Sequence, residues 1–129
     1  MRSLFLLTKT PIRYSDVLSL FMERFSGVEG CSEHDQISFG KSPNSLFLHL
    51  DESKLHNEGE DWDDYPEEFI QTIPMDNPFC AHVEYHLSKI SKRVVELLSP
   101  FYPELYVIVE DSQLWAGPAK EYLSKDFDY

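Results

Sequence analysis

Residues Phe79–Leu87 carry the most regular pattern in the sequence, because apolar and polar side chains alternate along the whole segment. Strict alternation is typical of a β-strand with one buried face and one polar face. Ser88 is then the expected N-cap of a helix whose apolar residues recur at helical spacing to about Ser99, and Pro100 ends it. Glu104–Glu110 alternates again and is predicted to be a strand. This part of the chain therefore predicts a strand, a helix and a second strand.

The first half of the chain supplies further strands and a helix. Arg2–Thr8 is a short apolar run, suited to a central strand covered on both faces. Ser15 is the expected N-cap of a helix whose apolar residues repeat at helical spacing, and Gly27 is its expected stop. Gln36–Gly40 and Ser45–Asp51 both alternate, and a polar turn joins them. We predict that these two segments form a hairpin.

Together these elements predict one domain over residues 1–129. Their order is strand, helix, strand, strand, insertion, strand, helix and strand, followed by a short helix from Ala119 to about Ser124. A chain of 129 residues that is 42% hydrophobic is long enough for one core and too short for two. We therefore predict an α+β fold with a single antiparallel or mixed sheet and helices on one face. A ferredoxin-like arrangement with an extra strand is the first choice of topology.

The chain is strongly acidic. It has 23 Asp and Glu residues against 11 Lys and Arg residues, a formal net charge of -12 and a pI near 4.6. Such a charge repels the phosphates of nucleic acids and the headgroups of anionic lipids, so neither a nucleic acid nor a membrane is expected as a partner. The same charge attracts basic proteins and speeds their encounter. Binding to a basic protein and simple maintenance of solubility both remain open interpretations.

The sequence favours a cytoplasmic protein without a familiar catalytic motif. The apolar run at residues 1–7 is too short for a signal-peptide core or a membrane span. Cys31 and Cys80 have no close spacing and fit a reducing compartment. Neither cysteine lies in a known nucleophile signature, and the sequence has no Gly-x-Ser-x-Gly elbow and no glycine-rich phosphate loop. We therefore expect no enzymatic activity, no catalytic residue and no cofactor.

An insertion at about residues 51–77 interrupts the strand pattern. Its centre crowds carboxylates around aromatic rings, and such carboxylates are easier to hold in order when Lys or Arg from a partner approaches. Trp and Tyr are also frequent among the residues that dominate interface affinity. We therefore predict that partner binding uses Glu60, Asp61, Trp62, Asp63, Asp64, Tyr65, Glu67 and Glu68.

This insertion has two other interpretations. One is a solvated acidic loop whose aromatic side chains pack on the core. The other is a calcium site, because Asp61 and Asp63 have the spacing of two EF-hand ligands. Tyr65 and Pro66 stand where that loop needs an oxygen ligand and a glycine, so the calcium interpretation is disfavoured.

His82, Glu84 and His86 form a second candidate group, because alternate residues of a strand point to the same face. Two imidazoles and a carboxylate can hold zinc or iron and leave positions open for a substrate. We nevertheless predict a polar sheet face on which these side chains pair with neighbours or water, and hence no metal, and the metal site is the alternative. The residues expected to share this face are Phe47, His49, Tyr106 and Ile108.

The closing strand and turn carry a resemblance to a known group of proteins. Leu105–Asp111 reads Leu-Tyr-Val-Ile-Val-Glu-Asp, and Trp115–Gly117 follows it. In a short acidic α+β chain with an aromatic and acidic insertion, this ending resembles the immunity proteins of bacterial polymorphic and contact-dependent toxin systems. The resemblance covers the whole chain only in outline.

This resemblance implies a stoichiometric inhibitor that neutralises a basic protein toxin, often a nuclease, by covering its active site or an adjoining surface. The residues that it implicates first are those from Glu60 to Tyr65. Two alternatives from other classes remain. One is a small metal-dependent enzyme that uses His82, Glu84 and His86. The other is a ligand-binding module that dimerises through its open sheet face.

Overall fold

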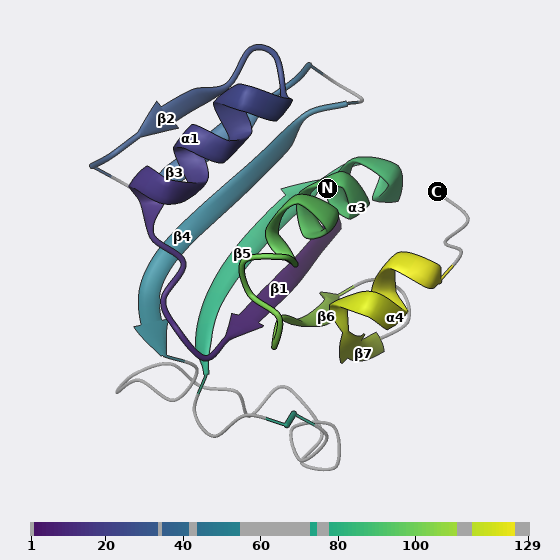
Figure 1. Ribbon diagram of the computed structural model, residues 1–129. Helices are drawn as coiled ribbons and strands as arrows, with labels where there is room; N and C mark the ends of the chain where they lie inside the picture. The colour runs from purple at the N-terminus through teal and green to yellow at the C-terminus, as the bar shows by residue number, and fades with distance from the viewer. Residues whose placement is uncertain are drawn as a thin grey trace.

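One antiparallel sheet organises the chain (Figure 1). The computed structural model describes residues 2–33, 35–41, 44–54, 73–74, 78–110 and 115–125. Over these residues the sheet has seven strands, in the order β2-β3-β4-β5-β1-β6-β7. The strands are β1 (Arg2–Thr8), β2 (Glu29–Cys31), β3 (Gln36–Phe39), β4 (Leu46–Lys54), β5 (Phe79–Tyr85), β6 (Tyr106–Glu110) and β7 (Trp115–Pro118).

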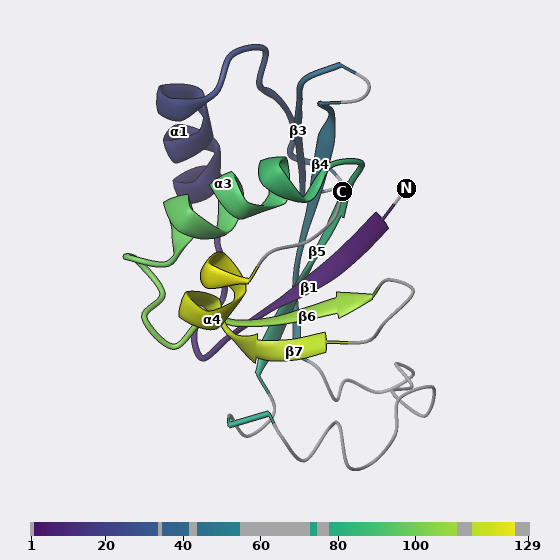
Figure 2. The same cartoon turned by 90° about the vertical axis from the view of Figure 1, so that its right-hand side faces the viewer.

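The helices of the described residues pack on one face of this sheet. Seen along the sheet, α1 (Tyr14–Arg24), α3 (Ser88–Leu98) and α4 (Ala119–Ser124) all lie on the same side (Figure 2). The predicted α+β fold with a single sheet and helices on one face is therefore confirmed. None of these helices is both long enough and apolar enough to cross a membrane.

The centre of the sheet has the ferredoxin-like strand order. Apart from β2 and β3, which lie between α1 and β4 in the chain, the elements up to β6 are a strand, a helix, two strands, a helix and a strand, namely β1, α1, β4, β5, α3 and β6. Their strands lie side by side as β4-β5-β1-β6, and every neighbouring pair is antiparallel. Strands β2 and β3 widen one edge and β7 widens the other, so this core carries three added strands where one was predicted.

The main core lies between the sheet and the helices. Apolar side chains from the strands, such as Leu4, Leu48 and Val83, meet Phe21 of α1 and Val94 of α3, and all five are at most 1% exposed. Burial of this size is the main favourable term in folding, because it removes apolar surface from water.

Strand β1 is buried on both of its faces, as its apolar sequence predicted. Leu4 and Leu6 face the helices, whereas Leu7 belongs to a second cluster on the opposite face with Tyr106 and Ile108. The partly buried side chains packed against this second cluster are Phe5, Ile73, Cys80 and Ala116.

A buried hydrogen bond joins the last helix to α3. The hydroxyl groups of Ser91 and Tyr122 lie 2.5 Å apart, and Ser91 also donates to the carbonyl oxygen of Ser88 at 2.8 Å. Burial raises the pKa of Tyr122 well above its ordinary value, because the neutral phenol is favoured in an apolar environment. The short helix α4 is therefore fixed by its packing as well as by its own sequence.

Both predicted serine N-caps are wrong. Helix α1 has Arg13 at its N-cap and Ser15 inside its first turn, and α3 has Leu87 at its N-cap and Ser88 as its first residue. Neither N-cap side chain makes a capping hydrogen bond. The packing of apolar residues on the sheet decides where these helices start, and it outweighs a cap that contributes about 1 kcal/mol.

Candidate functional site

The sheet face opposite the helices carries the candidate site. Strand alternation turns Ala81, Val83 and Tyr85 of β5 toward the helices, and it turns His82 and Glu84 to the other face. On β4, the buried residues Leu46, Leu48 and Leu50 alternate with Phe47 and His49 in the same way. The structure confirms which residues share this face with them, as predicted: Phe47, His49, Tyr106 and Ile108.

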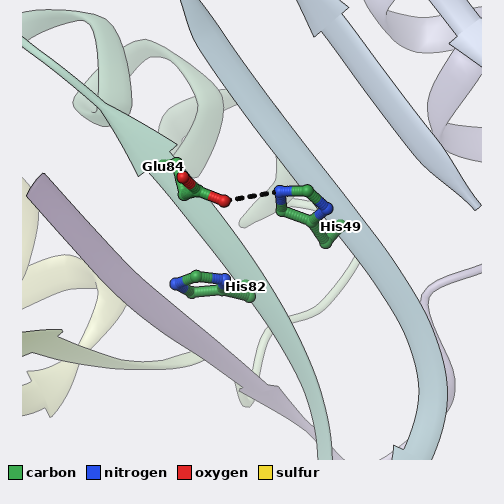
Figure 3. A group of neighbouring side chains, drawn as sticks. All are labelled: His49, His82 and Glu84. Carbon is green, nitrogen blue, oxygen red and sulfur yellow. Dashed lines mark hydrogen bonds and ion pairs between the residues drawn. The ribbon is translucent and has the colours of Figure 1, made fainter. Parts of the chain in front are cut away.

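The register of the sheet brings three of these side chains together. His49 of β4 lies directly opposite His82 of β5, and Glu84 is the next residue of β5 on that face. The Nε2 atom of His49 and the Oε1 atom of Glu84 lie 2.8 Å apart (Figure 3). The rings of His49 and His82 stack with centroids 5.7 Å apart and an angle of 24°. We call His49, His82 and Glu84 the His-His-Glu cluster.

The His-His-Glu cluster has the composition of a metal site. Each residue offers one ligand atom, and the three ligand atoms lie within 4.8 Å of one another. The side chains of His49 and Glu84 are 35% and 36% exposed, so solvent reaches the cluster. The cluster can therefore exchange ions with solution without opening the fold.

His86 does not belong to this cluster, so the predicted set of His82, Glu84 and His86 is corrected. Strand β5 ends at Tyr85, so His86 lies just beyond the strand. Its backbone carbonyl oxygen instead accepts a hydrogen bond of 2.5 Å from Arg2. His49 takes its place because the strand register, and not spacing along one strand, sets which side chains meet.

The cluster continues into an apolar region of the same face. Phe5 of β1 lies opposite His82, and their rings stack with centroids 4.9 Å apart. Beyond Phe5 the face consists of the second core cluster around Leu7 and Ile108, both fully buried. On this face the His-His-Glu cluster over β4 and β5 is therefore partly exposed, whereas Leu7 of β1 and Ile108 of β6 are buried.

A cationic groove lies on the helix side and was not anticipated from the sequence. Two adjoining cavities, of about 530 and 660 Å³, are both lined by Arg24, Phe25 and Arg93. The guanidinium of Arg93 lies 4.9 Å from the centre of the Phe25 ring, which stacks on Phe39 at 4.2 Å. Lys89 lines the second cavity. Only the packing of α1 beside α3 brings these cations together, so no sequence motif could have shown them.

The predicted partner-binding residues fall outside the part of the chain that the structure describes. They are Glu60, Asp61, Trp62, Asp63, Asp64, Tyr65, Glu67 and Glu68. Lys54, the last described residue before them, ends β4 and lies opposite Phe79 of β5. Strand β4 runs to Lys54, so the first residues of the predicted insertion, 51–54, belong to the sheet.

Comparison of the chain with models of protein families, with curated proteins and with solved structures finds no match.

Proposed function

We propose that this chain is a binding protein of the immunity type, which neutralises a basic protein toxin of the nuclease class and has no catalytic activity of its own. One observation carries the proposal, and it is the distribution of charge. The net charge is -12, and residues 55–72 contribute seven carboxylates and no Lys or Arg. These carboxylates belong to Glu58, Glu60, Asp61, Asp63, Asp64, Glu67 and Glu68.

The anchoring of this acidic segment supports the proposal. Lys54 and Phe79, which flank it, pair with each other across β4 and β5. Phe79 is also paired with Thr8 of β1, so the anchor lies among the central strands of the sheet. Segments held on a rigid scaffold in this way commonly carry the binding residues of a protein.

The proposed mechanism is electrostatic and steric. The carboxylates occupy a cationic cleft of the toxin in the place where a substrate phosphate would lie, and Trp62 and Tyr65 supply apolar contact area. The negative field of the whole chain speeds the encounter with a positive surface. Ion pairs that lose their water on binding then slow dissociation.

The binding partner to be tested is the protein encoded by the reading frame next to the gene for this chain. We expect it to be a secreted protein with a basic C-terminal domain. The purified basic domain is titrated with this chain by calorimetry at low and at physiological salt. Replacement of Asp61, Asp63 and Asp64 by Lys should weaken binding by about 2–5 kcal/mol, because charge pairs buried in an interface are lost and repulsion is introduced.

A matched control is available among the described residues. Glu23, Glu29 and Glu33 are exposed on α1, on β2 and in the turn after β2, and their replacement by Lys changes the net charge by the same amount. An equal loss of affinity in both triple variants would assign binding to the overall charge and not to the acidic segment. Unchanged affinity of the Asp61, Asp63 and Asp64 variant at low salt would remove the segment from the proposal.

A further inference from the structure

We propose that the His-His-Glu cluster binds a divalent transition-metal ion, and that zinc is the ion it fits best. The proposal rests on the open face of the sheet and is independent of toxin binding. It needs only His49, His82 and Glu84, which all lie on strands that the structure describes.

The ligand set selects the class of metal. Imidazole nitrogen is a ligand of borderline softness that suits zinc, copper, iron and nickel, whereas calcium and magnesium prefer sites made wholly of oxygen. Two histidines and one carboxylate are a known set for zinc with an open coordination position. His49, His82 and Glu84 provide one such set from two neighbouring strands.

The spacing of the ligand atoms is close to what zinc requires. Bonds of about 2.0–2.2 Å in a tetrahedral site place neighbouring ligand atoms about 3.4 Å apart. The three ligand atoms of the cluster already lie within 4.8 Å of one another, and the His49 and Glu84 atoms are 2.8 Å apart. The largest adjustment is therefore about 1.4 Å, which small side-chain rotations provide because the side chains of His49 and Glu84 are partly exposed.

The hydrogen bond between His49 and Glu84 lies where the metal ion would bind. The Nε2 atom of His49 and the Oε1 atom of Glu84 lie 2.8 Å apart, within hydrogen-bonding distance. A zinc ion bound to both atoms would take the place of this hydrogen bond, and the proton of a neutral His49 ring would then be carried by the other ring nitrogen, Nδ1. The positive charge of the metal would then hold the Nε2 and Oε1 atoms close together.

The surroundings keep the ligands in place before the ion arrives. His49 and His82 lie opposite each other in a regular antiparallel pair, which fixes their backbone positions. Phe5 stacks on the other side of the His82 ring with the centroids 4.9 Å apart. Three protein ligands leave at least one position for water or for an outside donor, as in zinc sites that are not closed.

The test is titration of the metal-free full-length chain with zinc, measured by calorimetry and by competition with a chromophoric chelator. We expect one zinc per chain, and His49→Ala or His82→Ala should weaken binding at least about tenfold. Glu84→Gln, which keeps the shape of the side chain, should also weaken binding. His86→Ala is the matched control, because His86 follows the same strand but lies outside the cluster.

The visible absorption of bound cobalt reports on the metal ligands directly, and a variant that changes only the stability of the fold does not alter it. Cobalt bound by two imidazoles and a carboxylate in tetrahedral geometry gives visible absorption that His49→Ala should abolish and His86→Ala should leave unchanged. Circular dichroism shows whether each variant is folded. The proposal is overturned if the folded wild-type chain binds no zinc, or if His86→Ala weakens binding as much as His49→Ala does.

Discussion

Replacement of Leu7 by Ala tests whether the sheet is packed on both faces. Leu6 and Leu7 are adjacent on β1 and both are 0% exposed, but Leu6 faces the helices and Leu7 faces the opposite side. The change removes three carbon atoms, which at about 0.8 kcal/mol each amounts to about 2.4 kcal/mol. Incomplete collapse of the resulting cavity raises the expected cost to about 3–5 kcal/mol for either residue.

Urea unfolding followed by far-ultraviolet circular dichroism measures this cost. If the free energy of unfolding falls by about 1.5 kcal/mol per molar urea, a loss of about 3 kcal/mol of stability lowers the midpoint of unfolding by about 2 M urea. We expect Leu6→Ala and Leu7→Ala to shift the midpoint by similar amounts. Leu20→Ala is the control and should shift it less, because Leu20 lies on α1 and is only partly buried.

The reasoning is refuted if Leu7→Ala shifts the midpoint by less than a third of the shift caused by Leu6→Ala. Leu7 would then not be enclosed in solution, and the second cluster around Tyr106 and Ile108 would not contribute to stability. A similar shift for both variants would instead establish that the second cluster, on the face opposite the helices, is a true core.

Two further predictions concern backbone strain and pH. Gly27 and Gly40 both have positive φ, 70° and 80°, but a Cβ atom at Gly40 would also overlap the backbone oxygen of Asn44. Gly27→Ala should therefore cost about 1 kcal/mol and Gly40→Ala about 2–3 kcal/mol in urea unfolding, and equal costs would contradict this. Tyr122→Phe should cost about 1 kcal/mol at pH 8, where the hydrogen bond to Ser91 is intact. The pKa of Tyr122 is raised above 10.0 in the fold, so its contribution to stability is complete below pH 10 and declines above it. Above pH 10 the difference in free energy of unfolding between wild type and Tyr122→Phe should therefore fall by about 1.4 kcal/mol per pH unit. A constant difference up to pH 11 would refute this.

Much of the fold could be predicted because its central strands have strong local patterns. Arg2–Thr8 was predicted with the bounds that β1 has, and the short helix Ala119–Ser124 was also predicted correctly. The predicted strand Phe79–Leu87 ends two residues earlier, at Tyr85. Arg2–Thr8 is a continuous apolar run and is buried on both faces, whereas Phe79–Leu87 alternates and is buried on one, so the local pattern and the final packing agree in both strands.

The edge strands could not be predicted, since they lack such a pattern. Strand β2 consists of Glu29, Gly30 and Cys31, all of them exposed, so nothing apolar marks it. The predicted turn around Trp115–Gly117 belongs to strand β7, which contains Gly117 and Pro118. Both strands exist because a neighbouring strand offers hydrogen-bonding groups, and that neighbour is known only once the sheet has formed.

The candidate site was predictable in part. Alternation along one strand correctly placed His82 and Glu84 on the same face. The third member, His49, belongs to another strand and was predicted only to share that face. Its position opposite His82 depends on the pairing of β4 with β5, which is not fixed by a tight turn because a long segment separates the two strands.

The position of β1 in the sheet sets the order in which the chain can fold. Both neighbours of β1 come late in the sequence, since Arg2 pairs with Tyr85 and Ser3 pairs with Glu110. During synthesis from the N-terminus, the hairpin of β3 and β4 can form early, whereas β1 has no partner strand until β5 has emerged. Contacts between such distant residues slow folding, because the loop between them must close first. The nascent chain must therefore keep this apolar strand from aggregating until β5 has been made.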